Sequence, residues 1–288
     1  MFVAVPIAGG DESNSRDGLP LRAERGFERS LARVQPLLER YGYGASFLAV
    51  MLPANYRIGL VAPSHYDTII EICKMVYPTE EPYTVEELED HRQVFPQGQF
   101  VAIDETHGSV AGVHFTLRLQ LMDFHIDDPW DILTAGGSFL DHNPKGTTLY
   151  GADIMVHPGN QHHGIAHALT DQARFLVEEE RLWRMVGASR LPGYAKCSST
   201  MNIEQYVEMV LNGRLFDPVL SVHIKDGWSA LKPIYGYLQH DEDSAGWAEV
   251  IQWVNPACPP PPEFELRNFL ANSLGTNRKT PPTVPGAS

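Results

Sequence analysis

The residues with the clearest chemical potential lie between an apolar segment typical of a strand and a segment with helical spacing of its apolar residues. They are Gln161, His162, His163, Gly164, Ile165 and Ala166. The first N–H groups of a helix have no partner within the helix and carry partial positive charge, so they can bind a pyrophosphate. Gly164 and Ala166 leave room for such a ligand. The segment therefore predicts a phosphate-binding helix start, with a purely steric role of the glycine as the alternative.

Asp153 lies in the middle of the apolar segment that precedes this loop. Burial raises the pKa of a carboxyl group, so this side chain could accept a proton from an amine, directly or through water. A structural acid that holds a neighbouring loop through hydrogen bonds is the alternative. Tyr194 could act as a general acid that protonates a leaving thiolate, or it could be an ordinary packed tyrosine.

Three histidines close to the loop, His162, His163 and His167, raise the question of a metal site. His163 and His167 would share one helix face. The zinc-peptidase pattern, however, needs a glutamate where Gly164 stands, and an obvious third ligand does not follow. We therefore expect no metal. Imidazole groups at the helix start would instead offset the negative charge of a bound phosphate.

The composition argues against several classes of protein. The 288 residues include 22 Lys and Arg against 36 Asp and Glu, which gives a formal net charge of −14. An acidic chain without a basic stripe does not favour nucleic-acid binding. The longest apolar runs fall far short of the roughly 20 residues that a membrane span needs, so we expect no membrane association. Three scattered cysteines and the lack of a secretion-signal pattern predict a cytoplasmic location.

The elements that would position these residues alternate along the chain, and they predict an α/β (α+β) domain over residues 57–255. Helices are predicted at Asp67–Val76, Val85–Arg92, Gly164–Glu180 and Ile203–Leu211, the last with Asn202 as its cap and Gly213 as its left-handed stop. Strands are predicted at Arg57–Ala62, Gln99–Asp104, Ser109–Leu121, Leu149–Val156, Trp183–Gly187, Val219–Ile224 and Trp247–Val254, with a looser extended stretch at Leu231–Leu238.

Both ends of the chain differ from this domain. Residues 1–56 are predicted to be an N-terminal extension with one helix, at Glu24–Tyr41. Residues 256–288 hold eight prolines, a composition that favours extended, solvated backbone over packing. We therefore expect a Pro-rich, disordered tail after the domain.

Around the loop the sequence resembles the GNAT superfamily of N-acetyltransferases, in which the pattern Gln/Arg-x-x-Gly-x-Gly/Ala binds the pyrophosphate of acyl-CoA. Residues Gln161 to Ala166 match this pattern. The resemblance implies that the backbone of Ile154, Met155 and Val156 pairs with the pantetheine arm. It also implies a mixed, mostly antiparallel central sheet with helices on both faces, splayed between the two strands that flank the Gly164 helix.

Longer stretches are similar to one branch of this superfamily, namely residues 81–88, 150–158, 190–194, 216–221 and 237–253. The branch contains GNAT domains fused to carbon–nitrogen hydrolases and, more distantly, the GNAT-like loading domains of polyketide synthases. The loading domains are described as removing CO2 from malonyl-CoA and passing the acetyl group to a carrier-protein thiol.

A Trp, a Thr, a His and an Arg line the site of those loading domains, and the matching positions here are Tyr83, Ser189, His223 and Leu238. The resemblance implies that the Ser189 hydroxyl and the His223 imidazole polarise a thioester carbonyl or stabilise an enolate. We expect Ser189 in a loop and His223 on a strand. Leu238 cannot pair with a carboxylate as an arginine does, and its presence therefore argues against malonyl decarboxylation. Arg190 or Lys232 would have to bind the malonyl carboxylate instead.

The resemblance implies an acyl-CoA-dependent acyltransferase that uses acetyl-CoA or another acyl-CoA as donor, without a metal. In the first hypothesis the acceptor is a small-molecule amine and Asp153 is the base. In the second, malonyl-type decarboxylation is coupled to S-acyl transfer to a carrier-protein phosphopantetheine, with Ser189 and His223 at the acyl group. The third hypothesis is a non-catalytic module that binds acyl-CoA.

Overall fold

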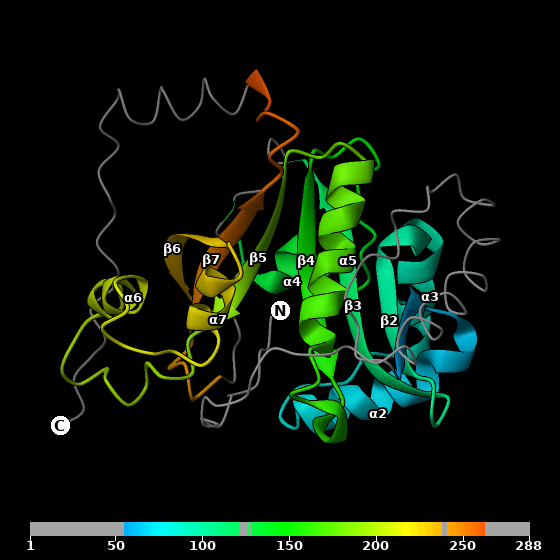
Figure 1. The fold of residues 1–288 in the computed structure, drawn as a ribbon, viewed down its shortest axis with the longest axis horizontal. Coiled ribbons are helices and arrows are strands. Elements are labelled where there is room, and N and C mark those ends of the chain that lie inside the picture. The colour runs from blue at the N-terminus through cyan, green and yellow to red at the C-terminus, as the bar shows by residue number, and fades with distance from the viewer. Residues whose placement is uncertain (1–54, 121–125, 127, 238–240, 263–288) are drawn as a thin grey trace, which may run out of the picture.

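The computed structural model describes residues 55–120, 126, 128–237 and 241–262. These residues form a seven-stranded sheet with helices on both faces, as the sequence predicts (Figure 1). The strands are β1 (Tyr56–Leu60), β2 (Gln99–Asp104), β3 (Ser109–Leu119), β4 (Thr148–Val156), β5 (Arg184–Arg190), β6 (Ser229–Tyr235) and β7 (Trp247–Val254). The predicted helix at Glu24–Tyr41, Leu238 and the tail beyond residue 262 lie outside the described residues.

The sheet is mixed and mostly antiparallel, in the order β1-β2-β3-β4-β5-β7-β6. Only β4 and β5 run parallel, and the chain between them crosses over through a helix. Such a crossover is what joins parallel neighbours, whereas antiparallel neighbours such as β2 and β3 need only a short turn. The parallel pair is therefore the point at which the two halves of the sheet meet.

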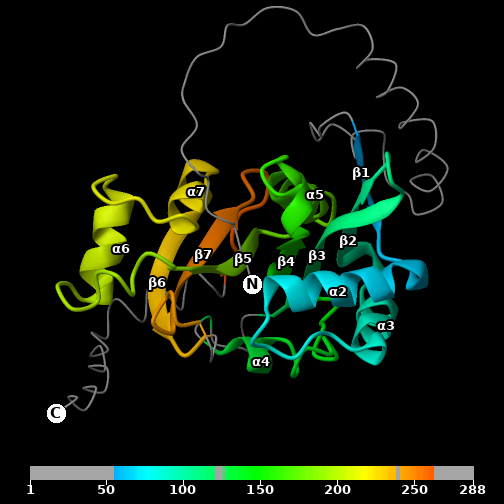
Figure 2. The ribbon, with the colours of Figure 1, turned by 90° about the horizontal axis from the view of Figure 1, so that it is seen from below.

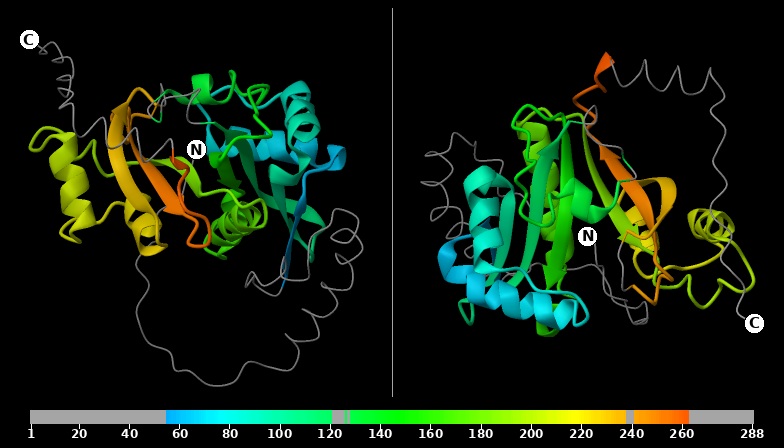
Figure 3. Two further views of the ribbon diagram at one scale, coloured as in Figure 1. Left: turned by 90° about the horizontal axis from the view of Figure 1, so that it is seen from above. Right: turned by 180° about the vertical axis from the view of Figure 1, so that it is seen from behind.

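The helices divide between the two faces of the sheet (Figure 2). One face, which we call the α2 face, is covered by α2 (Tyr66–Val76), α3 (Val85–Val94) and α4 (Trp130–Leu133). The other, which we call the α5 face, is covered by α5 (Ile165–Glu179) and α7 (Leu220–Lys225), with α6 (Ile203–Leu211) beside α7 (Figure 3). None of the described helices is long and apolar enough to cross a membrane.

Each face has its own apolar core. Met155 packs in the cluster on the α2 face, and its neighbours Ile154 and Val156 pack in the cluster on the α5 face. Successive side chains of a strand point to opposite faces, so a strand that is covered on both faces is buried along its whole length. All nine residues of β4 are buried. A polar side chain in such a strand therefore needs a partner on its own face.

The structure corrects the predicted strand at Val219–Ile224, which is helix α7 instead. The Asp217 carboxylate accepts hydrogen bonds from the N–H groups of Val219 at 2.9 Å and Leu220 at 2.8 Å. These bonds satisfy the first donors of the helix, as a cap does. His223 therefore lies on a helix, and its buried neighbour on the same face is Leu220, three residues earlier.

Strand β5 also differs from its prediction, because it extends to Arg190 instead of ending at Gly187. The strand extends this far because its pairing with β7 continues to Arg190, which lies opposite Ala248. Ser189 thus belongs to a buried strand and not to a loop. The loosely extended stretch predicted at Leu231–Leu238 overlaps β6, a strand that pairs with β7 and has a bulge at Leu231.

Candidate functional site

Strands β4 and β5 pair only at their first residues. The three pairs join Thr148, Leu149 and Tyr150 to Arg184, Met185 and Val186. Beyond them the two strands separate, as Figure 1 shows, and no β4–β5 pairing continues in the described part of the chain. The predicted splay is therefore present. The facing backbone groups of the two strands can pair with an extended ligand that lies between them.

A β-bulge marks the place where β4 leaves β5. Phe115 of β3 pairs with Asp153 and Thr116 with Gly151, so that Ala152 is the extra residue on β4. A bulge bends its strand and increases the local twist. The indole Nε1 of Trp130 donates a hydrogen bond to the Ala152 carbonyl at 3.0 Å, which fixes α4 against the bulge.

The predicted phosphate-binding loop lies at one end of this splay. Gly164 precedes α5 with a left-handed φ of 73°, and no side chain caps the helix. A Cβ at Gly164 would meet no atom within 4 Å, so the backbone conformation and not the available space favours glycine here. The side chain of Ile165 is buried in the α5-face core and anchors the start of the helix to the sheet. The first N–H groups of α5 therefore stand at an exposed, uncapped helix start.

The polar side chains of the loop are arranged around this helix start. His162, His163 and Gly164 are exposed, whereas Gln161 and Ala166 are partly buried. Asn160 donates from Nδ2 to the Tyr56 hydroxyl at 3.0 Å, which ties the loop to β1. His162 and His163 are thus placed where they could face a phosphate.

His167 has a different environment from the two loop histidines. Its ring nitrogens lie 3.2 Å from an oxygen of Asp171 and 3.1 Å from an oxygen of Asp226. Arg174 contacts the same two carboxylates, so these four side chains join α5 to the end of α7. His167 is therefore occupied by a helix-to-helix contact and does not belong with the phosphate loop.

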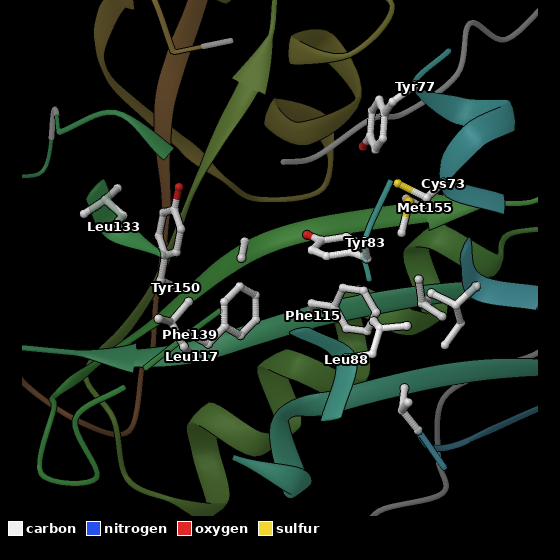
Figure 4. Packing of buried hydrophobic residues seen from close by; sticks show 14 of the residues in the cluster. Cys73, Tyr77, Tyr83, Leu88, Phe115, Leu117, Leu133, Phe139, Tyr150 and Met155 are labelled. Carbon is white, nitrogen blue, oxygen red and sulfur yellow. The ribbon is translucent and has the colours of Figure 1, made fainter. Parts of the chain in front are cut away.

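On the α2 face, Asp153 is held by two tyrosine hydroxyls. Tyr77 donates to one carboxylate oxygen at 2.7 Å, and Tyr83 donates to the other at 3.3 Å. Burial raises the pKa of Asp153 above its ordinary value, and the two hydroxyl donors oppose that rise. Figure 4 shows Tyr77, Tyr83 and Cys73 gathered over β4 near Met155. The acid predicted in mid-strand is thus buried and lies directly after the bulge.

Two further polar contacts extend this cluster toward β5. The hydroxyls of Tyr150 and Tyr237 share a short hydrogen bond, and burial raises the pKa of both. Arg190, at the end of β5, donates from Nε to Asp241 at 2.7 Å and from Nη2 to the other oxygen of the same carboxylate. Asp241 thus occupies the planar edge of the guanidinium group that a substrate carboxylate would otherwise use.

On the α5 face, the structure brings Ser189 and His223 together. Ser189 Oγ lies 3.1 Å from His223 Nδ1, although the two residues are far apart in sequence. Ser189 is fully buried, and Trp228 packs edge-on against the His223 ring. Burial and the nearby Arg174 charge lower the pKa of His223 to about 3, so the imidazole is neutral at physiological pH. The pair therefore offers neutral hydrogen-bonding groups.

Asp217 holds the helix that carries His223. It is fully buried and, besides capping α7, it accepts hydrogen bonds from the Gly193 N–H at 3.1 Å and the Tyr206 hydroxyl at 2.7 Å. A Cβ at Gly193 would lie 2.2 Å from the Tyr206 hydroxyl, so this contact needs glycine. The carboxylate thus joins the segment after β5, helix α6 and helix α7 in the arrangement that places His223 on Ser189.

Tyr194 packs away from both of these clusters. Its ring lies edge-on against Tyr206, and its hydroxyl donates to the Met201 carbonyl at 3.5 Å. Both contacts are with the segment around α6, and neither cluster, around Asp153 or around Ser189, includes Tyr194 within the described residues. A general-acid role for Tyr194 stays a prediction.

Three residues of these clusters were not singled out in the sequence. Tyr77 donates to Asp153, and Trp130 donates to the Ala152 carbonyl at the bulge. Both contacts join segments that are distant in sequence, so local sequence patterns do not indicate them. Glu249 is 1% exposed on β7, and its Cα is the register partner of Ser189. A glutamate within the apolar run Trp247–Val254 is the same kind of signal as Asp153 and could have been found.

These features are compatible with an extended diphosphate ligand such as a CoA thioester. The uncapped α5 start has N–H groups that could bind a diphosphate, and β4 at Ile154, Met155 and Val156 has an edge that does not pair with β5. Two buried polar clusters, around Asp153 and around Ser189, lie on opposite faces of this edge. Within the described ranges, no group of three or more His, Cys, Asp and Glu side chains could hold a metal ion.

Comparison with curated sequences identifies two proteins of Bacillus subtilis. The "Probable hydrolase YhcX" is 32% identical over 189 residues, which are 66% of this chain but only 36% of that protein. The "Uncharacterized N-acetyltransferase YkwB" is 33% identical over 179 residues, which are 62% of this chain and 78% of that protein. A search of protein-family models finds no match. The chain thus spans about a third of the hydrolase and most of the N-acetyltransferase.

Two solved structures share the fold. The GphF GNAT-like decarboxylase in complex with isobutyryl-CoA has a TM-score of 0.56 at 23% identity, covering 69% of this chain and 98% of that chain. The loading GNATL domain of CurA from Lyngbya majuscula has a TM-score of 0.60 at 17% identity, covering 69% of this chain and 97% of that chain. At these identities the likeness establishes the fold alone.

Proposed function

This chain belongs to the GNAT superfamily of N-acetyltransferases, and from that premise we propose that it transfers an acyl group from acyl-CoA to an amine, with Asp153 as the general base. The burial of Asp153 directly after the β4 bulge carries this proposal. This position supports the proposal, because Asp153 belongs to the strand along whose unpaired edge the pantetheine arm would run. The proposal also includes a cytoplasmic location, because the three cysteines are few and far apart in the sequence.

Acyl-CoA would be held mainly by backbone groups. The thioester supplies the activated acyl group. The uncapped start of α5 would bind the diphosphate, with His162 and His163 beside it, and the N–H groups of β4 would orient the thioester carbonyl. Most of the catalytic effect would come from positioning, because the acceptor attacks directly without an acyl-enzyme.

Asp153 would take the proton that the amine loses as it attacks. A carboxylic acid cannot accept a proton, so the rate should rise as the pH increases through the raised pKa of Asp153. The Tyr77 and Tyr83 hydroxyls stabilise the ionised form and keep it available. Both hydroxyls keep their own protons because burial raises their pKa well above the ordinary value.

The test is a panel of primary amines with acetyl-CoA, followed by chromatography of acylated product and released CoA. Asp153→Asn keeps the shape of the side chain but cannot accept a proton. We expect kcat to fall about 100-fold or more and the rise through the pKa of Asp153 to disappear, so that only the rise from deprotonation of the amine itself is left. Asp67→Asn, an exposed change at the start of α2, is the control and should leave both unchanged.

Two outcomes would contradict this proposal. Equal activity and pH profile in Asp153→Asn and wild type would remove Asp153 as the base. Protection of the protein by CoA against thermal unfolding, without turnover of any amine or of malonyl-CoA, would favour a binding module instead.

A second reaction is supported by the Ser189–His223 contact of 3.1 Å. We infer that this pair acts on the acyl group in a malonyl-type decarboxylation, followed by S-acyl transfer to a carrier-protein phosphopantetheine. Ser189 and His223 would stabilise the negative charge that develops on the thioester oxygen. Arg190 is engaged by Asp241 and does not offer its planar edge for the substrate carboxylate. Incubation with malonyl-CoA alone tests this reaction, because conversion to acetyl-CoA needs no acceptor.

A further inference from the structure

Glu249 is a buried acid beside the Ser189–His223 pair. It stands on β7 directly opposite Ser189 of β5, and cross-strand partners in an antiparallel pair point to the same face with Cβ atoms about 5 Å apart. The next residues on that face, Leu191 and Ile251, both pack in the α5-face core. Glu249 therefore points to the face that carries His223.

The Glu249 carboxyl group is poorly satisfied. Its side chain is 1% exposed, and in the described part of the chain its Oε2 atom has no hydrogen-bond partner. The N–H group at the Leu231 bulge of β6 lies near the carboxyl group and partly offsets the effect of burial. Burial raises the pKa of Glu249 to about 8, so the group holds its proton at neutral pH.

None of the nearby charged groups in the described residues forms an ion pair with Glu249 that would stabilise its ionised form. His223 on α7 is neutral, and Arg174 on α5 is paired with Asp171 and Asp226. The Tyr206 hydroxyl on α6 donates to Asp217. The other charged groups nearby point elsewhere: Glu204, Glu208 and Lys225 are exposed, and Lys232 of β6 is opposite Val250, on the α2 face.

We propose that Glu249 is the proton donor of the Ser189–His223 site and delivers its proton to the acyl group after decarboxylation. This inference rests on the second reaction proposed above. The bond between the carboxylate and C2 of the malonyl group breaks, CO2 leaves, and the electron pair forms an enolate at the thioester. The O–H bond of Glu249 then breaks as a C–H bond forms at C2, and solvent returns a proton to the carboxylate.

The Ser189–His223 pair itself contains no group that is a good acid at neutral pH. A neutral imidazole and a serine hydroxyl can donate hydrogen bonds to an enolate oxygen, but both are poor acids at neutral pH. A carboxylic acid gives up a proton far more readily. Because Glu249 and Ser189 are neighbours on one face, an acyl group that contacts Ser189 Oγ also lies within reach of Glu249.

The test compares Glu249→Gln with wild type in malonyl-CoA conversion, with CoA protection against thermal unfolding measured in parallel. Glutamine keeps the size and can accept the Leu231 N–H but has no acidic proton. We expect the conversion to acetyl-CoA to fall about 100-fold with unchanged CoA protection. In wild type the rate should fall as the pH rises above about 8, because Glu249 then loses its proton. Glu105→Gln, in the β2–β3 turn, is the control and should match wild type.

The outcomes separate this inference from the reaction on which it rests. If wild type leaves malonyl-CoA unchanged, the decarboxylation and the role of Glu249 are both wrong, whereas Asp153-dependent amine acylation is unaffected. If wild type converts malonyl-CoA and Glu249→Gln does so with the same rate and pH profile, only the role of Glu249 is wrong. If the variant does not fold, a wild-type rate that stays constant above pH 8 overturns the inference by itself.

Discussion

The two polar clusters on opposite faces of the β4–β5 splay have opposite chemistry. On the α2 face, burial raises the pKa of Asp153, and two hydroxyl hydrogen bonds oppose that rise and favour the ionised form. On the α5 face, His223 and Glu249 beside Ser189 are neutral at physiological pH, because burial disfavours the charged forms of both groups. One cluster is thus suited to accept a proton, and the other is suited to donate hydrogen bonds.

This difference follows from how each face packs against the same strand pair. The α2 face brings Tyr77, just after α2, and Tyr83, just before α3, over β4 as long side chains that reach the carboxylate. The α5 face places the short helix α7 over β5 and leaves Glu249 Oε2 without a partner in the described residues. The strand opening therefore has a different polar cluster on each face, and each of the two proposed reactions uses one of them.

The largest expected effect concerns Ser189. In Ser189→Ala the His223 ring loses its hydroxyl partner, and conversion of malonyl-CoA should fall about 100-fold, as removal of one oxyanion donor does. Amine acylation should change less than about twofold, because Asp153 lies on the other face. Ser198→Ala, an exposed change, serves as the control. Parallel loss of both activities in Ser189→Ala would mean that the two clusters are not separate.

A middle-sized effect is expected at Gly164, which both reactions share. Alanine at a φ of 73° costs about 1 kcal/mol of backbone strain, so Gly164→Ala should raise KM for acyl-CoA about fivefold in both assays with little change in kcat. Gly213→Ala is a matched control, with a φ of 67° and no atom within 4 Å of the new Cβ. An unchanged KM in Gly164→Ala would place the diphosphate elsewhere.

The smallest effect is expected from Tyr77→Phe. The hydrogen bond from Tyr77 lowers the pKa of Asp153, so its loss should raise that pKa further and move the rise of the amine-acylation rate to higher pH. At neutral pH the rate should fall about threefold, since less of the carboxylate is ionised, whereas malonyl-CoA conversion stays constant. Tyr235→Phe, exposed on β6, is the control. A profile that shifts to lower pH, or does not shift, would argue against Asp153 as the titrating base.

Much of the fold could be predicted from local patterns. The capping box of Asn202 and Gln205 and the left-handed Gly213 predicted both ends of α6, and the structure confirms them. The strand–loop–helix around Gly164 is also confirmed, because apolar periodicity and a glycine turn act within one segment. The pattern of Val219–Ile224 predicts a strand where the structure has helix α7, because an apolar run is common to both, although Asp217 before Pro218 is a helix-start signal.

The site could be predicted only in part. The resemblance to GNAT-like loading domains implies that Ser189 and His223 share a site, and in the structure Ser189 Oγ lies 3.1 Å from His223 Nδ1. The partners of Asp153 were not predicted, because Tyr77 reaches it across 76 residues of sequence and only the packing of α2 on β4 creates that contact. The position of Glu249 opposite Ser189 likewise depends on the register between β5 and β7, which the sequence does not specify.

The most direct test of the two-face account measures amine acylation and malonyl-CoA conversion side by side in Asp153→Asn and in His223→Ala. The account predicts that Asp153→Asn loses amine acylation and keeps malonyl-CoA conversion, and that His223→Ala shows the reverse. Equal protection of both variants by CoA against unfolding would show that the α5 start is intact. If each variant loses both activities to the same extent, the two faces form one catalytic unit and the account is wrong.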